Sequence, residues 1–163
     1  MKIIVLSVIT FATSSFADPF DGTWVSSCRK EVRNYGIRTL TAEGSNSEIV
    51  IDGSADARRN RRGVQIRIEG TNIFGRESEV VPDAHEFEQV IDSVTVTPHD
   101  PAVVLYFNSS SFCGEKNWRM GQEKQVSGRT CGEEKIPQRG ETVYQIYAFT
   151  PSESLLLGMK TKS

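Results

Sequence analysis

The amino-acid sequence predicts an all-β fold, either a sandwich or a barrel. Short segments with alternating or β-branched apolar residues recur along the chain, and turn-forming residues separate them. No window of about a dozen residues carries a helical stripe of apolar side chains. A length of 163 residues with 37 % hydrophobic residues suits one globular domain. This composition excludes a collagen, a disordered tail and a repeat array.

The clearest strand spans residues 64–69, where Val64, Ile66 and Ile68 fall on one face. Residues 93–97 alternate in the same way and stop at Pro98. The other predicted strands, in chain order, span residues 23–29, 37–42, 48–52, 102–107, 122–127, 142–149 and 155–161. Turn signals such as Asp52-Gly53-Ser54 lie between them.

Two of these predicted strands carry apolar residues on both faces. In the segment 102–107, Val103, Leu105 and Phe107 oppose Ala102, Val104 and Tyr106, and the segment 143–149 behaves similarly. An antiparallel sheet with one solvated face would keep stricter alternation. Packing on both faces fits a barrel and a sandwich equally, so this observation leaves both open.

The first 17 residues have the pattern of an export signal. Lys2 precedes an apolar run, and Ser15 and Ala17 are small residues at the expected positions before a cut. The run is too short to span a bilayer, which takes about 20 residues. We therefore expect a signal peptide at residues 1–17 and one mature domain at 18–163, the domain to which the barrel prediction below applies, in a periplasmic or secreted protein. The alternative for the same stretch is a buried N-terminal strand.

The three cysteines fit an exported protein with one disulfide. Cys113 and Cys131 are the predicted pair, because each precedes a glycine and together they flank a polar, turn-rich segment. Such a bond contributes about 3 kcal/mol in the chain-entropy model. Cys28 is predicted to be a small buried hydrophobic residue. Its pairing with either of the other cysteines stays open, and so does whether its thiol is free.

Three short strings occur in an order that is similar to one known family. Gly22-Thr23-Trp24 opens the first mature strand, Thr142 to Tyr147 contains two spaced tyrosines, and Leu156 to Lys162 ends in basic residues. Together they resemble lipocalins, in which a basic residue of the last strand lies across the first-strand tryptophan. Val143 and Met159 depart from the pattern, since the family has an acidic residue and an arginine at those places.

The resemblance implies a single antiparallel up-and-down β-barrel of about eight strands, with Gly22, Trp24 and Lys160 as its closing motif. The cysteine-flanked segment resembles small exported bacterial lipocalin-like proteins. The implied function is non-catalytic binding of a small hydrophobic or amphipathic ligand inside the barrel. An eight-stranded barrel holds one small ligand or is filled by its own side chains. The candidate lining residues are Ile66, Ile68, Phe87, Val94, Val96, Tyr106, Tyr144 and Ile146.

A basic cluster stands out against the formal net charge of −2: Arg58, Arg59, Arg61 and Arg62. It is either a patch for an anionic partner or a hairpin tip kept solvated by its charge. The patch interpretation leads to an alternative function, a protein-interaction or inhibitor module in which side chains fill the barrel and the loops bind the partner.

Signals for an enzyme or a cofactor are weak. The two histidines lie in polar, loop-like surroundings, and no nucleophile elbow or phosphate-binding glycine loop occurs. No cysteine or histidine pair has zinc-site spacing. We therefore expect no catalysis, no cofactor and no metal. The balanced charge also argues against nucleic acid, and we expect a monomer without a transmembrane segment.

Overall fold

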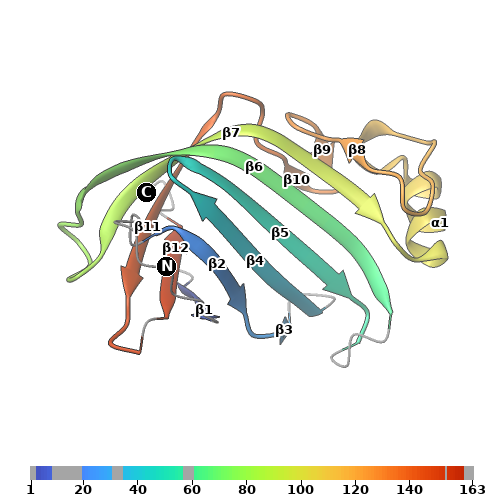
Figure 1. Ribbon diagram of the computed structural model, residues 1–163. Coiled ribbons are helices and arrows are strands. Elements are labelled where there is room, and N and C mark those ends of the chain that lie inside the picture. The colour runs from blue at the N-terminus through green and yellow to red at the C-terminus, as the bar shows by residue number, and fades with distance from the viewer. Residues whose placement is uncertain (1–2, 9–19, 31–34, 57–60, 153, 160–163) are drawn as a thin grey trace.

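A computed structural model describes residues 3–8, 20–30, 35–56, 61–152 and 154–159. Its main feature is an antiparallel sheet that curls into a nearly closed barrel (Figure 1). The predicted all-β class and antiparallel barrel are confirmed, and a sandwich does not form. None of the helices in these described ranges is long and apolar enough to cross a membrane.

Eight strands follow one another around the barrel within the described part of the chain. They are β1 (Ile3–Val8), β2 (Gly22–Ser26), β4 (Tyr35–Glu43), β5 (Asn46–Ser54), β6 (Arg62–Glu77), β7 (His85–Pro98), β11 (Thr142–Phe149) and β12 (Leu155–Met159). Each pairs antiparallel with the next, and β12 pairs with β1. The short β3 (Arg29–Lys30) adds to β4.

Strand β7 has three partners. It pairs with β6 over most of its length, whereas β11 pairs only with its first half, His85 to Val90. Near its end, Thr95 and Val96 pair with β8 (Lys124–Gln125). The chain therefore leaves the barrel after β7 and returns only at β11. We call the intervening residues 99–141 the cap.

The cap contains helix α1 (Pro101–Ser110), the 3₁₀ turn η1 (Phe112–Gly114), and a small sheet of β9 (Thr130–Cys131) and β10 (Glu134–Lys135). Figure 1 shows α1 beyond the end of β7, at the opposite end of that strand from the β6–β7 hairpin.

The prediction of a strand at residues 102–107 was wrong, because this segment is the middle of α1. The Asp100 carboxylate accepts a hydrogen bond from the Ala102 N–H at 2.7 Å, and Pro101 occupies the first turn. An aspartate followed by a proline is a helix-start signal. The sequence interpretation treated these two residues as part of a turn.

The N-terminal strand β1 lies between β2 and β12 in the sheet. The structure thus describes the uncut chain, and residues 9–19, with the predicted cleavage site after Ala17, lie outside the described residues. Whether a signal peptide is removed stays a prediction.

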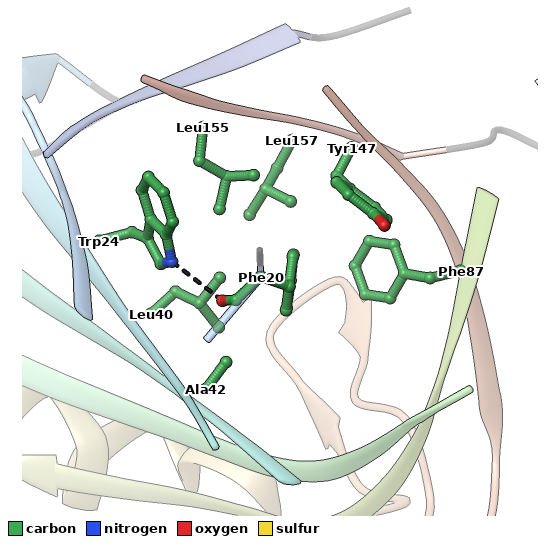
Figure 2. Packing of buried hydrophobic residues seen from close by; sticks show 8 residues of the cluster. All are labelled: Phe20, Trp24, Leu40, Ala42, Phe87, Tyr147, Leu155 and Leu157. Carbon is green, nitrogen blue, oxygen red and sulfur yellow. Dashed lines mark hydrogen bonds between the residues drawn. The ribbon is translucent and has the colours of Figure 1, made fainter. Parts of the chain in front are cut away.

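One end of the barrel is filled by an aromatic end cluster, whose buried members are Phe20, Trp24, Leu40, Ala42, Phe87, Tyr147, Leu155 and Leu157. Figure 2 shows side chains from strands on opposite sides of the barrel converging on Phe20, which lies just before β2. The Phe20 ring lies 5.4 Å from the Phe87 ring and 5.1 Å from the Tyr147 ring. Trp24 Nε1 donates to the Phe20 carbonyl at 3.2 Å, so the indole nitrogen is satisfied inside the cluster.

A second group, the cap cluster, joins the inner face of β6 and β7 to the cap. Its buried members are Ile91, Val94, Val96, Phe107, Cys113, Trp118, Val126 and Cys131. The predicted disulfide Cys113–Cys131 is confirmed and lies in this cluster. Cys28 lies outside it and is exposed just beyond the end of β2, so the prediction of a buried Cys28 was wrong.

Gly70 on β6 lies where the β6–β7 register shifts. A Cβ atom at this position would lie 2.8 Å from the Val90 carbonyl oxygen and 2.9 Å from Gln89 Cγ. Such distances are too short for real side chains, so β6 and β7 approach each other here only because residue 70 is glycine.

We expect Gly70→Ala to lower the free energy of unfolding by about 1–3 kcal/mol, because the added methyl group overpacks the strand pair. Urea denaturation measures the change. Gly63→Ala on the same strand is the matched control, since its Cβ would lie 3.4 Å from the nearest atom, and its effect should stay within about 0.5 kcal/mol. Equal effects of the two substitutions would contradict this explanation.

Candidate functional site: a cavity inside the barrel

A cavity of about 150 Å³ lies between the aromatic end cluster and the cap cluster. Its apolar wall is formed mainly by Leu40, Ile49, Ile51, Ile68, Ile91 and Val143. These residues come from five different strands, because alternate residues of each strand face the interior. Pro137 of the cap and Leu157 of β12 complete the apolar surface.

Three polar side chains interrupt this apolar wall: Arg38, Gln89 and Gln145. Gln145 Nε2 donates to Gln89 Oε1 at 3.2 Å, and Gln89 Nε2 donates to the Ser47 hydroxyl at 2.9 Å. Ser47 Oγ lies 2.9 Å from Asn72 Oδ1, to which it donates.

Ser47, Asn72 and Gln89 of this chain are buried, with Gln89 only 2 % exposed, whereas Gln145 is half-buried. Polar groups at such depth are stable only when they are hydrogen-bonded, so the network holds Gln89 and Gln145 in defined positions at the cavity wall.

The structure brings only one of the predicted lining residues, Ile68, to the cavity wall. Phe87 belongs to the aromatic end cluster. Ile66, Val94 and Val96 lie on the same inner face but pack in or against the cap cluster. These four therefore close the two ends of the interior instead of lining the cavity.

The other three predicted lining residues lie away from the cavity. Tyr106 is 57 % exposed on α1, and Tyr144 is 45 % exposed on β11. Ile146 shares the face of Tyr144, and the residues of β11 that line the cavity are Val143 and Gln145.

The sequence interpretation chose the wrong face of β11 because both faces are apolar enough to be buried. Gln145 gave no local signal of the inner face, since a polar residue in an antiparallel strand usually marks the solvated side.

Two of the three residues of the predicted closing motif lie in the described part of the chain. Trp24 is buried in the aromatic end cluster, with its ring 5.4 Å from the Phe149 ring, and Gly22 begins β2. Lys160 lies outside the described residues. A cation–π contact does occur at the other end of the interior, where Lys124 Nζ lies 5.1 Å from the Trp118 ring centroid.

Of the predicted basic patch, Arg58 and Arg59 lie outside the described residues. Arg61 donates to Asp100 from Nε at 3.1 Å and from Nη2 at 2.7 Å. Arg62 likewise binds Asp52 through Nε and Nη2. Both described arginines thus form ion pairs at the end of the barrel. The pair between Arg61 and Asp100 connects the barrel to the start of α1.

Two carboxylates hold the cap in place electrostatically. The Ala102 N–H and then the Arg61 guanidinium lower the pKa of Asp100, against the opposing effect of desolvation. Hydrogen bonds from Arg129 and then Lys124 lower the pKa of Glu115. Both groups favour the folded state in their ionised forms.

Among the described residues, no group of three His, Cys, Asp or Glu side chains could hold a metal ion. The pKa of His99 is lowered by burial and by the Arg62 charge, but His99 lies at the end of β7, away from the cavity.

No protein-family model matches the chain, and no curated protein matches it either. The antiparallel, nearly closed barrel is compatible with a calycin-like fold.

We expect the free energy of unfolding to fall as the pH drops from about 5 towards 2, partly because Asp100 and Glu115 become protonated. Both pKa values lie below their ordinary values of 3.8 and 4.5, so the stabilisation is present above these values and lost below them. Asp100→Asn and Glu115→Gln should each flatten this dependence in urea denaturation at several pH values. Asparagine also caps helices well, so α1 should persist.

Glu79→Gln in the β6–β7 hairpin is the control, because Glu79 is exposed and pairs with the equally exposed Arg76 at 2.9 Å. An unchanged pH dependence in both cap variants would refute the proposed role of these carboxylates.

Proposed function

We propose that this chain is an exported, lipocalin-like protein that binds a small hydrophobic or amphipathic ligand inside its barrel without transforming it. The single observation that carries the proposal is the 150 Å³ cavity between the two buried clusters. An engineered apolar cavity of about this volume holds benzene. A mostly apolar wall with a few fixed polar groups is the usual composition of a small-molecule site.

The binding free energy would come mainly from burial of apolar ligand surface, at about 25 cal/mol per Å² before the cost of ordering. The buried hydrogen-bond network would position the polar end of the ligand. Because the barrel strands hold both the wall and this network, little rearrangement would be needed on binding.

The disulfide Cys113–Cys131 supports export, since such bonds persist in oxidising compartments. Cleavage after Ala17 would remove β1 and leave β2 and β12 without the strand between them. Phe20, at the centre of the aromatic end cluster, would be retained. The proposal therefore requires β2 and β12 either to join or to remain as the two edges of the mature barrel.

The alternative, an interaction module working through its arginine cluster, has less support. Arg61 and Arg62 are already bound to Asp100 and Asp52 within the chain. We therefore favour the barrel interior, and not the arginine cluster at the surface, as the functional site.

We expect Val143→Phe to abolish binding of a small amphipathic probe such as benzyl alcohol, because the larger side chain would fill the cavity. Binding is measured by ligand-observed NMR, and circular dichroism checks that the variant is folded. Ile73→Phe is the matched control, since Ile73 is 54 % exposed and is not one of the residues that line the cavity. Unchanged binding by a folded Val143→Phe protein would show that the cavity is not the site.

Native mass spectrometry of the protein from its own host should reveal a monomer that lacks residues 1–17 and carries a small bound molecule. A second mass spectrum, recorded under denaturing conditions, gives the mass of the mature chain. A full-length mass would refute cleavage, and ligand-free protein from every preparation would count against the binding function.

A further inference from the structure

We propose that the ligand is a small neutral carbonyl compound, whose oxygen accepts hydrogen bonds from the amides of Gln89 and Gln145. This inference rests on the proposed function, because it specifies the ligand of the same cavity. The observation behind it is an excess of amide N–H donors in the hydrogen-bond network beside the cavity.

The network forms a polar layer between the cavity and the aromatic end cluster. Gln89 and Gln145 line the cavity. Two residues away on the same strands, and therefore on the same face, Phe87 and Tyr147 belong to the aromatic end cluster. Asn72 lies directly opposite Gln89 in the β6–β7 pairing, so their side chains are neighbours on the inner face. A ligand in the cavity would therefore have one end against this layer.

The polar layer has more donors than its own acceptors use. Gln89 Nε2 and Gln145 Nε2 each make one hydrogen bond, although each carries two hydrogens. Asn72 is 3 % exposed, and its Nδ2 has no hydrogen-bond partner among the described residues.

The oxygens of the layer are largely occupied. Those of Gln89, Ser47 and Asn72 each accept one hydrogen bond from within the layer, and Gln145 Oε1 accepts none from a described residue. Three amides with unused N–H hydrogens thus stand against one such oxygen. Buried amides are rarely left unpaired in folded proteins, so an acceptor from outside the chain would complete this layer.

The amides of the layer are uncharged, and they favour an uncharged ligand. No aspartate or glutamate lines the cavity, so a cationic ligand would find no opposite charge there. Arg38 also lines the cavity, but it already has an interaction partner within the chain. Burying an ion beside neutral groups costs far more than burying a hydrogen-bonded carbonyl group. A carbonyl oxygen accepts two hydrogen bonds and donates none, which matches the two amides at the wall.

The rest of the cavity limits the apolar part of the ligand. About 150 Å³ corresponds to one six-membered ring. The hydrogen bonds from Gln145 to Gln89 and from Gln89 to Ser47 hold the amides in place before binding, which lowers the cost of ordering them. Cyclohexanone has both features that this wall selects, a carbonyl oxygen and an apolar body of the right size, and it serves as the probe.

The test compares four probes that share a six-membered ring, at pH 7 by ligand-observed NMR titration. Methylenecyclohexane replaces the oxygen of cyclohexanone by a CH₂ group, which cannot accept a hydrogen bond. Cyclohexylamine is a cation and cyclohexanecarboxylate is an anion. We expect both charged probes to bind at least about tenfold more weakly than cyclohexanone, because neither finds a free opposite charge in the cavity.

Gln145→Met removes a donor and keeps the length of the side chain. Because a hydrocarbon leaves water more readily than a ketone, we compare the affinity ratio of cyclohexanone to methylenecyclohexane between proteins. This ratio should fall about tenfold in Gln145→Met, as the loss of one net hydrogen bond predicts. Gln122→Met is the matched control, since Gln122 is exposed and does not line the cavity, and it should leave the ratio unchanged.

The carbonyl carbon of ¹³C-labelled cyclohexanone gives a second readout that needs no variant. Its NMR signal should lie downfield of its position in cyclohexane when the ketone is bound to wild-type protein, because a hydrogen bond polarises the carbonyl group. In Gln145→Met the signal should move back towards the cyclohexane value. A merely structural role of Gln145 would not move it. If Gln145→Met does not fold by circular dichroism, the wild-type signal still decides the question.

The outcomes separate this inference from the proposed function. A bound signal at the cyclohexane position, or an unchanged ratio in a folded Gln145→Met protein, would overturn this inference and leave a barrel that binds apolar molecules. Tighter binding of either charged probe than of cyclohexanone would overturn the choice of a neutral ligand. Failure of all four probes, together with failure of benzyl alcohol, would overturn both the inference and the proposed function.

Discussion

The divided pairing of β7 is the constraint on which the rest of the structure depends. Its first half binds β11 and closes the barrel, while its second half has turned away from β11 and pairs with the cap. A strand can donate and accept hydrogen bonds only along two edges, and β6 occupies one edge for most of the length. The interior is consequently walled by strands at one end and covered by the cap at the other.

This division explains why the apolar interior forms two clusters with a cavity between them. Aromatic rings of large volume fill the closed end, and α1, Trp118 and the disulfide fill the covered end. Between them the wall residues are mainly isoleucine, leucine and valine, which do not meet across the barrel. Empty apolar volume costs stability, and this cost is the physical reason for our proposal that the cavity binds a ligand.

Much of the barrel could be predicted from local patterns. Strict alternation at Val64, Ile66 and Ile68 located β6, and the β-branched and aromatic residues of 142–149 located β11, because side chains in a strand alternate between two faces. The pair Cys113 and Cys131 followed from the turn-rich segment between them. Helix α1 was missed, since its run of apolar residues suits both periodicities and the helix-start signal lies in the Asp100-Pro101 pair that precedes it. The cavity wall was largely missed as well, because Arg38 and Gln89 have no local signal of facing inward.

The sequence by itself determined the all-β class and the positions of most strands, because these follow from the periodicity of neighbouring residues. It favoured the Cys113–Cys131 disulfide but left a bond to Cys28 open, and the structure decided between them. Only the tertiary structure decided which face of each strand points inward and which residues meet around the cavity. That choice depends on strand register and on the bulge at Gly70, where a shift of one residue exchanges the inner and outer faces. Arg38, Gln89 and Gln145 are separated by long stretches of chain, and barrel closure alone brings them to one wall.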